Sequence, residues 1–348
     1  MPTLSSEDLK GHCARIFEAA GLDEAEAGRI AWSLVLSNLM GHDSHGVVRV
    51  SQYVKALKDG IVHPGKKISV IQDAPAAAVV DGEWGFGQTV CDQAMDLAIS
   101  KAKVCAVSAV ELYNSSHIGR LGEYVERAAE QGMIGICMCN NHGGGRLQAA
   151  FGGLDPVMSP NPVAVGVPTG KGYPIVVDMT SSVVAEGKIR MKKNMGEEVP
   201  EGWAMDYDGE PVRDPAKFYG PPRGAIHPFG GISAHKGYAL AVVIDILSGA
   251  LGGSGCSREG APSGGNGVFL MAIRIEAFTG PDRFQEEVDT FIDFLKSSRR
   301  LPGFDEILMP GEGEFRRRRN LESEGVTVDD ETWRQIGETA KLVGTSVD

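Results

Sequence analysis

Long apolar runs are absent from this sequence. No stretch of about 18 uninterrupted apolar residues occurs, which is the length that a membrane-spanning helix requires. The polar, acidic start also lacks the basic flank and short apolar run of a secretory signal. We therefore expect a cytoplasmic protein without a membrane partner.

Cysteine is sparse, and positive charge is in deficit. The six cysteines include no C-x-x-C pair, and a chain of 348 residues can bury a core without disulfides. We expect free thiols, no metal site, and Cys137 and Cys139 on one face of a strand. The 46 acidic residues outnumber the 34 basic ones, and this net charge of −12 argues against nucleic acid as a partner.

The hydropathy period changes from helical to strand-like along the chain. Ser5 or Ser6 is placed to cap the first of three N-terminal helices, and Asp23 to cap the second. The helices are expected at 5–20, 23–40, 47–57, 89–103, 120–131, 182–193, 236–251, 281–298 and 329–343. Strands are expected from Ile68 onward, at 104–110, 134–139, 163–168, 174–179 and 267–275. This alternation predicts an α/β protein, in which the all-round apolar helix 236–251 is buried and 196–231 is a long connection.

The dinucleotide fingerprint of a Rossmann fold is incomplete. The segment Gly85 to Val90 follows a strand and opens a helix, but valine replaces the third glycine of G-x-G-x-x-G. We interpret this segment as a tight strand-to-helix turn. A nucleotide would have to bind through a different arrangement.

The densest polar cluster of the sequence occupies residues 41–53. His45 and Ser44 precede Arg49, and Tyr53 follows one helical turn later on the same face. An arginine fork suits a carboxylate, and a histidine exchanges protons near neutral pH, so the group could bind and protonate a 2-oxo acid. The alternative is a loop in which Asp43 and Ser44 cap the next helix and the histidines are solvated. Composition alone does not separate these two interpretations.

Three other segments place polar groups where a strand ends or a helix begins. They are 113–119 with His117, 178–182 with its hydroxyls, and 230–237 with a histidine and a lysine. Such positions bind ligands in α/β proteins, and helix N-termini receive phosphates. Ordinary turn formation and helix capping explain the same residues.

Seven short motifs occur in one order along the chain. They are D-S-H-G-V-x-R at 43–49, N-S-S-H at 114–117, S-P-N-P at 159–162, V-D-M-T-S-S at 177–182, G-K-I at 187–189, E-G-W-A-M-D at 201–206 and H-K-G-Y at 235–238. This set resembles the malate/L-lactate dehydrogenase family that lacks a Rossmann fold. That family also includes ureidoglycolate, sulfolactate and diketogulonate enzymes and the cyclic imine reductases. The resemblance covers nearly the whole chain and favours a functional role for residues 41–53.

The resemblance implies a fold, a reaction and an assembly. It implies an α/β protein with a mixed-sheet, non-Rossmann NAD(P)-binding domain at 113–280 and a small α/β segment at 68–112. A helical dimerisation domain would be assembled from 1–67 and 281–348. The implied reaction is hydride transfer between NAD or NADP and a small, anionic, malate- or lactate-like 2-hydroxy acid. The implied assembly is a homodimer with its active site near the subunit interface.

The resemblance also implies a role for individual residues. His45 and His117 match histidines that different members are thought to use as the acid or base, and Ser44 matches the hydrogen-bonding neighbour of His45. The imine-reducing and diketogulonate branches favour His45. Substrate contacts are implied for Arg49, Tyr53, Asn161 and Lys188. Cofactor contacts are implied for Asp178, Met179, Thr180, Ser181, Ser182, His235, Lys236, Pro310, Gly311 and Glu312.

Lys188 helps to separate the branches of the family. The imine reductases carry an aspartate at this position, whereas a lysine suits an anionic oxo acid. We therefore expect an NAD(P)-dependent 2-hydroxy acid dehydrogenase. The alternatives are a cyclic ketimine reductase and a catalytically silent ligand-binding homologue.

Two further segments and one carboxylate allow specific expectations. The loop Asn140 to Gly145 either reshapes the pocket, with His142 near the substrate, or is a surface excursion. The four arginines at 316–319 either meet the 2′-phosphate of NADP or fan around a helix in solvated and salt-bridged positions. Asp245, on the apolar helix, is expected to be a buried carboxylate with a partner.

Overall fold

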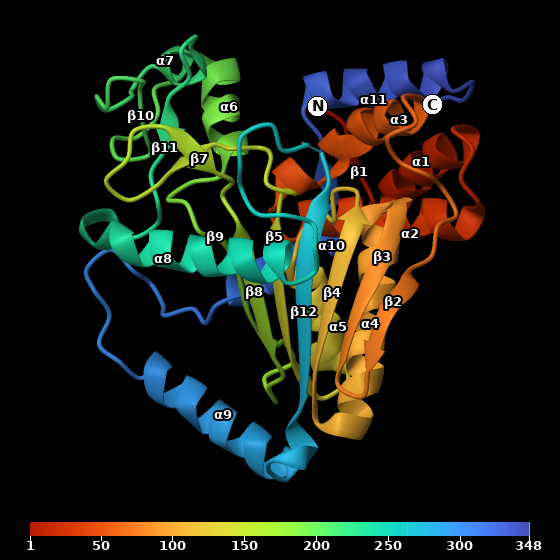
Figure 1. Ribbon diagram of the computed structural model, residues 1–348, viewed down its shortest axis with the longest axis vertical. Helices are drawn as coiled ribbons and strands as arrows, with labels where there is room; N and C mark the ends of the chain where they lie inside the picture. The colour runs from red at the N-terminus through yellow and green to blue at the C-terminus, as the bar shows by residue number, and fades with distance from the viewer. Residues whose placement is uncertain (263, 348) are drawn as a thin grey trace.

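A mixed seven-stranded sheet forms the centre of the molecule (Figure 1). The computed structural model describes residues 1–262 and 264–347. In spatial order the strands are β2 (Ser69–Ala74), β3 (Ala77–Gly85), β4 (Val107–Ser115), β12 (Asn266–Arg274), β5 (Met133–Asn140), β8 (Pro162–Val167) and β9 (Ile175–Thr180). The β3–β4 pair is parallel, and the other neighbouring pairs of this sheet are antiparallel. The predicted mixed α/β fold is confirmed, and its pairing differs from the parallel sheet of a Rossmann fold.

Two helices cover one face of this sheet and bury its main core. They are α4 (Gly87–Cys105) and α5 (Gly122–Glu130), which lie behind the sheet in Figure 1. Along β5, alternate residues point into this core, and Cys137 and Cys139 are both buried in it. The prediction that they share one face is confirmed because side chains alternate along a strand. All six thiols lie in the described residues and are free.

The two ends of the chain build a helical layer beside the sheet. The helices α1 (Ser6–Ala19), α2 (Glu24–Leu39), α3 (Val50–Lys58) and α11 (Asp330–Leu342) share one apolar core. The predicted N-caps are confirmed: Ser5 Oγ accepts from the Asp8 amide at 3.1 Å, and Asp23 Oδ1 accepts from the Glu26 amide at 2.8 Å. A two-stranded ribbon of β1 (Thr3–Leu4) and β13 (Val326–Thr327) joins the two ends.

A third core lies in the lobe around α6 (Glu186–Met195) and α7 (Pro215–Tyr219). Its small sheet has the order β10 (Ala204–Met205), β11 (Ala225–Ile226), β6 (Gln148–Ala149) and β7 (Pro156–Met158). The expected connection at 196–231 therefore contains elements of its own. The helix expected from residue 182 begins four residues later, because Ser182 forms a β-bridge with Pro228 and its hydroxyl donates to the Val184 carbonyl.

The helix expected to be buried is exposed on one side in the single chain. It comprises α8 (Ala234–Asp245) and a π-helical continuation at Ile246–Ala250, and it crosses the other face of the sheet (Figure 1). Val243, Ile246 and Leu251 on this helix are 49%, 50% and 59% exposed. The prediction that Asp245 is a buried carboxylate with a partner is confirmed. Its two oxygens accept hydrogen bonds from Asn140 Nδ2 and from the Ser257 amide, each at 2.9 Å.

Within the described residues, three α-helices, rather than the two expected, follow β12. They are α9 (Pro281–Lys296), α10 (Glu312–Glu324) and α11. Helix α10 has no apolar stripe from which its bounds could be predicted. Ion pairs one turn apart, between Arg316 and Glu312 and between Arg318 and Glu322, stabilise it instead. No helix within the described residues is long and apolar enough to cross a membrane.

Strands from 68–112 and from 113–280 pair in the same sheet, through β4 and β12. The boundaries of the three predicted domains stay a prediction.

Candidate functional site

A rigid turn between α2 and α3 carries the first candidate residues. It consists of two 3-10 turns, η1 (Asp43–His45) and η2 (Val47–Arg49). Asn38 stabilises both turns, because its Nδ2 donates to Asp43 Oδ1 at 2.7 Å and its Oδ1 accepts from the Val47 amide at 2.9 Å. A side chain at Gly46 would collide with Asn38. The helix capping expected in the alternative interpretation is absent, since neither 3-10 turn nor α3 has a side-chain cap.

The two candidate histidines stack on each other. His45 and His117 have ring centroids 5.5 Å apart and planes inclined by 19°. Ser44 Oγ lies 3.0 Å from His45 Nδ1. Tyr53 Oη lies 2.7 Å from His117 Nδ1, and Gln88 Nε2 donates to the same phenolic oxygen at 2.8 Å. Segments far apart in sequence thus meet in one hydrogen-bonded cluster.

The hydrogen bond from Gln88 to Tyr53 determines the direction of the hydrogen bond between Tyr53 and His117. Because the phenolic oxygen of Tyr53 accepts from Gln88, its own proton can be donated to His117 Nδ1. This arrangement assigns the neutral His117 ring a proton on Nε2, the nitrogen left for a ligand.

The strand-to-helix turn at residues 85–87 positions His117. A Cβ at Gly87 would collide with the His117 carbonyl, so the start of α4 packs directly on the histidine backbone. The Gly87 amide donates to Ser116 Oγ at 2.8 Å, and the Ile118 amide donates to Asn266 Oδ1 at 3.0 Å. The predicted turn is confirmed. The contacts by which this turn and Gln88 support His117 were not predicted, because they join residues that are distant in sequence.

Burial and neighbouring cations keep both imidazoles neutral. Burial, followed by the charges of Arg49, His42 and Arg120, lowers the pKa of His45 to about 3. Burial, followed by His45 and Arg49, lowers the pKa of His117 well below its usual value. Both rings are therefore neutral at neutral pH.

Arg49 brings a positive charge to the cluster. Its Nε donates to the Ser44 carbonyl at 2.7 Å, and its Nη1 donates to Gln52 Oε1 at 2.6 Å. No ion pair to a carboxylate is formed by this half-buried guanidinium among residues 1–262 and 264–347. A ligand carboxylate beside the histidines would supply the missing negative charge.

Two of the three segments expected to contact a cofactor, 178–182 and 310–312, lie at the two ends of β9. At its C-terminal end, Asp178 Oδ2 accepts from the Gly122 amide at 2.7 Å, and Thr180 Oγ1 lies 2.9 Å from Ser182 Oγ. At its other end, the Val176 amide donates to the Pro310 carbonyl at 3.0 Å. Gly311 packs against Val176 with a φ of +85° that favours glycine. Met179 is half-buried and Glu312 is buried in an ion pair with Lys296.

Several predicted residues lie outside these hydrogen-bonded groups. Asn161 is fully buried, and its Nδ2 donates to the Ala241 carbonyl at 3.4 Å. Ser181 is buried against Gln148. Lys188, on α6, and His235 and Lys236, on the first turn of α8, are exposed. No hydrogen bond within the described chain connects them to the histidine pair.

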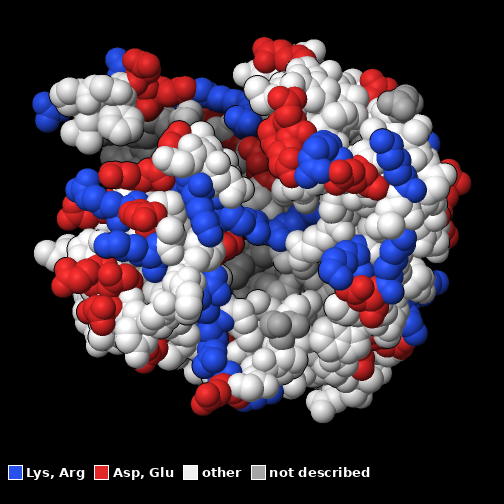
Figure 2. Space-filling view, turned by 90° about the horizontal axis from the view of Figure 1, so that it is seen from above, with Lys and Arg blue, Asp and Glu red and all other residues white. Residues whose placement is uncertain are grey.

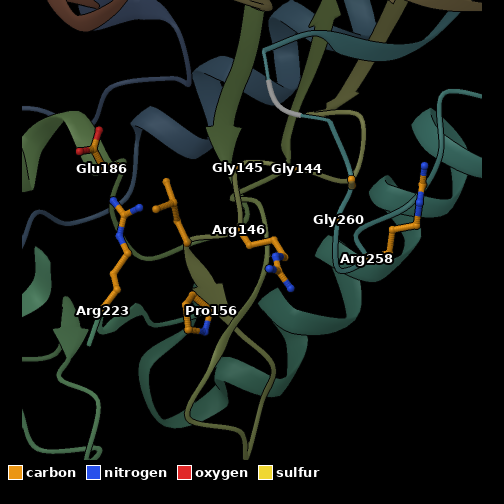
Figure 3. Close-up of a pocket in the computed structure, with 10 residues that line it drawn as sticks. Gly144, Gly145, Arg146, Pro156, Glu186, Arg223, Arg258 and Gly260 are labelled. Carbon is orange, nitrogen blue, oxygen red and sulfur yellow. The ribbon is translucent and has the colours of Figure 1, made fainter. Parts of the chain in front are cut away.

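A cavity of about 600 Å³ lies at the glycine-rich loop (Figure 3). It is lined by Gly144, Gly145, Arg146, Leu147, Pro156, Glu186, Arg223, Arg258, Gly260 and Ala261. The loop 140–145 is thus part of a pocket wall, and its interpretation as a surface excursion is wrong. His142 is 3% exposed and packs edge-on against Trp84, with ring centroids 5.3 Å apart.

The arginine run at 316–319 fans around α10. Arg316 pairs with Glu306 and Glu312, Arg318 pairs with Glu322, and Arg319 donates to the Gly172 carbonyl. The helix-surface interpretation of this run is therefore confirmed for these three side chains.

Comparison with known proteins gives one consistent family. The sequence profile described as malate/L-lactate dehydrogenase matches residues 4–337. A malate dehydrogenase of Pyrococcus abyssi is 36% identical over 349 residues, covering 98% of this chain and 95% of its own. The solved sulfolactate dehydrogenase of Methanocaldococcus jannaschii has a TM-score of 0.88 at 36% identity, covering 99% of this chain and 98% of its own. The solved delta1-piperideine-2-carboxylate reductase of Pseudomonas syringae has a TM-score of 0.82 at 27% identity, covering 98% and 100%.

These similarities extend over nearly the whole chain. The chain belongs to the malate/L-lactate dehydrogenase family. It is an oxidoreductase of the 2-hydroxy acid type, and its family implies a nicotinamide cofactor.

Proposed function

We propose that this protein interconverts a small, malate- or lactate-like 2-hydroxy acid and its 2-oxo acid, with NAD or NADP as the hydride carrier and histidine as the acid–base group. The observation that carries this proposal is the cluster in which the Arg49 guanidinium lies beside the stacked His45 and His117 rings. A carboxylate receptor and a proton-transfer group thus lie side by side, as a 2-oxo acid requires.

The substrate carboxylate binds to Arg49. The hydrogen bonds to the Ser44 carbonyl and to Gln52 use Nε and Nη1 of this guanidinium, so Nη2 is left to bind the ligand. Lys188 and Asn161 are proposed substrate contacts on the family resemblance. Lys188 follows Gly187, whose Cα faces Ser44, and its charge suits an anionic substrate.

Proton transfer is assigned to His45, with His117 as its partner. During oxidation a neutral imidazole accepts the proton of the substrate hydroxyl, and during reduction an imidazole donates a proton to the carbonyl oxygen. After burial, Arg49 is one of the charges that lower both histidine pKa values, and a carboxylate on Arg49 would neutralise this contribution. Binding of the acid therefore raises these pKa values toward the range in which reduction can proceed. Ser44 and Tyr53 hold the two rings through their Nδ1 atoms.

The residues along β9 and at the start of α8 fit a dinucleotide. Exposed His235 and Lys236 lie on the first turn of α8, so a cation near the positive end of the helix dipole would face an incoming pyrophosphate. The remaining proposed contacts are Asp178, Met179, Thr180, Ser181, Ser182, Pro310, Gly311 and Glu312. When bound, the cofactor would supply or accept the hydride at the C2 carbon of the substrate.

We also propose a homodimer with the active site near its interface. The exposed Val243, Ile246 and Leu251 of α8 support an apolar contact that a second copy of the chain would cover. The six free thiols support a reducing compartment, and the cytoplasm is the proposed location.

Absorbance at 340 nm tests the proposed reaction. Purified protein is assayed with NADH and with NADPH against a panel of 2-oxo acids and cyclic imine carboxylates. Turnover of oxo acids is expected. Turnover of cyclic imines alone would instead identify a ketimine reductase, which the similarity to the Pseudomonas syringae enzyme makes the second candidate. Cofactor binding without any turnover would indicate a catalytically silent homologue.

His45→Ala and His117→Ala test the acid–base assignment. At least one of them should lower kcat by about a hundredfold or more, since positioned acid–base groups contribute about that much. The exposed His63→Ala serves as the matched control. If both site variants keep the wild-type rate, histidine acid–base catalysis is excluded.

A further inference from the structure

We propose that Asn266, Asn140 and Asp245 are positioning residues, which hold the backbone beside His117 against α8 through a buried chain of hydrogen bonds. The inference rests on the proposed function, because it assumes that His117 takes part in proton transfer with His45. It gives a role in the reaction to residues of β12, β5 and α8, elements that carry none of the proposed acid–base groups.

The strand that leads to His117 leaves its regular pairing just before the histidine. In the pairing of β12 with β4, Asn266 lies opposite Ser115 and Val268 lies opposite Leu112, so two residues of β4 face one residue of β12. Asn114, inside this bulge, has a φ of +50°. A bulge bends its strand and interrupts the ladder of backbone hydrogen bonds. The residues that follow β4 therefore need other partners.

Asn266 provides one of these partners. Its Oδ1 accepts a hydrogen bond from the Ile118 amide at 3.0 Å, which is the amide that directly follows His117. Its Nδ2 donates to the carbonyl of Asn140, the last residue of β5, at 2.8 Å. One side-chain amide thus connects the backbone beside the histidine to the end of a neighbouring strand.

Asn140 continues the chain of hydrogen bonds to α8. Its Nδ2 donates to Oδ1 of Asp245, the last residue of α8, at 2.9 Å. The other carboxylate oxygen accepts from the Ser257 amide at 2.9 Å. Asn266, Asn140 and Asp245 are 8%, 1% and 5% exposed. Hydrogen bonds that are shielded from water in this way are strong, and a satisfied network of them is rigid.

Two glycines bring the backbone directly onto Asn140. A Cβ at Gly249, in the π-helical continuation of α8, would lie 2.6 Å from Asn140 Nδ2. A Cβ at Gly267, in β12, would lie 2.8 Å from Asn140 Oδ1. The asparagine side chain has little room to turn, so the position of His117 depends on that of α8.

Helix α8 also carries residues proposed for the cofactor. His235 and Lys236 lie on its first turn, and Asp245 ends it, while the helix crosses one face of the sheet (Figure 1). Hydride and proton transfer require the cofactor and the acid–base group in one geometry. A helix that supports both can fix their relative positions, so loosening the link to His117 should lower kcat.

The KM of the acid should change little. Lys and Arg side chains gather along the hollow in the middle of the face shown in Figure 2. Asn266 is uncharged and buried, so replacing it leaves the surface charge that attracts an anionic acid unchanged. A positioning role therefore predicts that kcat falls while KM is kept.

Steady-state kinetics of Asn266→Ala and Asp245→Asn test this prediction. The second variant places an amide where two donors need acceptors, at the end of the chain farthest from the histidine. Each kcat should fall about tenfold, with KM within about twofold of wild type. The control is Ser108→Ala, which removes a buried hydrogen bond to the Ala98 carbonyl at the other end of β4. It should lower the Tm and keep the wild-type kcat.

A double-mutant cycle with Tyr53→Phe separates positioning from general destabilisation. Tyr53 holds the ring of His117, whereas Asn266 holds its backbone. Because both substitutions act on the same histidine, the combined loss of kcat should be clearly smaller than the product of the two single losses. Losses that multiply would show that Asn266 acts independently of His117 and would overturn the inference.

The proton NMR resonance of His117 Hε1 gives a readout that does not require turnover. It is assigned by its loss in His117→Ala, and Asp245→Asn should shift it more than Ser108→Ala does. In an active protein, a lower kcat without this shift, or the shift with a wild-type kcat, would overturn the inference while the dehydrogenase stands. If wild type turns over neither oxo acids nor cyclic imines, the proposed function fails, and the resonance alone then decides whether α8 positions His117. Asp245→Asn carries both readouts if Asn266→Ala does not fold.

Discussion

The phenolic oxygen of Tyr53 lies 2.7 Å from Nδ1 of His117, and it accepts a hydrogen bond from Gln88 on its other side. The buried tyrosine keeps its proton at neutral pH, since burial raises its pKa to about 12. Tyr53 is thus a positioning residue that fixes the tautomer and the plane of a histidine ring.

Tyr53→Phe removes this hydrogen bond while keeping the ring. We expect kcat to fall about tenfold, since one net hydrogen bond contributes up to about 1.5 kcal/mol. The KM of the acid should change by less than about twofold because Arg49 is untouched. Steady-state kinetics measure both quantities, and the exposed Tyr207→Phe is the matched control. An unchanged kcat would show that His117 does not depend on Tyr53.

His45 makes the stability of the free protein depend on pH. Its folded-state pKa, lowered to about 3, lies below the unfolded value of about 6.5, so the unfolded chain binds more protons below that pH. This histidine therefore costs stability as the pH falls from 7.5 to 5.5.

His45→Gln should remove that cost. Between pH 7.5 and 5.5, its free energy of unfolding should fall by about 1 kcal/mol less than that of wild type. Urea denaturation at the two pH values measures the difference, with the exposed His63→Gln as control. Equal losses in wild type and His45→Gln would mean that His45 is protonated in the folded protein at pH 5.5.

Arg49→Lys keeps the charge but loses the planar fork. The KM of the acid should rise about tenfold or more, because a lysine cannot hold both the Ser44 carbonyl and a bidentate carboxylate. The exposed Arg299→Lys controls for a general effect of arginine replacement. A KM within twofold of wild type would place the acid elsewhere.

Gly87→Ala tests the contact between α4 and His117. The new Cβ would collide with the His117 carbonyl, and overpacking of this kind costs about 1–3 kcal/mol. We expect a lower Tm together with a lower kcat. Gly28→Ala is the matched control, because Gly28 lies in α2 with open space at its Cβ. That variant should keep its kcat and gain up to about 1 kcal/mol in stability.

The fold class and much of the chemistry could be predicted from sequence because their signals are local. Ser44, His45 and Arg49 lie within one short motif, and the strands of the main sheet have strong hydropathy patterns. His117 could be paired with them through family resemblance. The tautomer of His117 could not, since it depends on Gln88, which lies in a different helix.

The cavity could not be predicted because its residues share no local pattern. Arg146, Arg223 and Arg258 come from three irregular segments that tertiary contacts bring together.

The predicted burial of the helix at 236–251 was wrong for a related reason. An all-round apolar helix predicts burial, but one side of it is left uncovered in a single chain.

The contact between α3 and α11 has a consequence for biosynthesis. Helix α3, which begins directly after Arg49, packs against α11, where Ser51 Oγ lies 2.7 Å from Thr339 Oγ1. A growing chain can complete the seven strands of the sheet once β12 has emerged, yet the helix behind Arg49 still lacks its support. The proposed carboxylate-binding site at Arg49 is thus among the last features to form. A ribosome-bound chain that ends before residue 330 should fold its sheet without binding the acid.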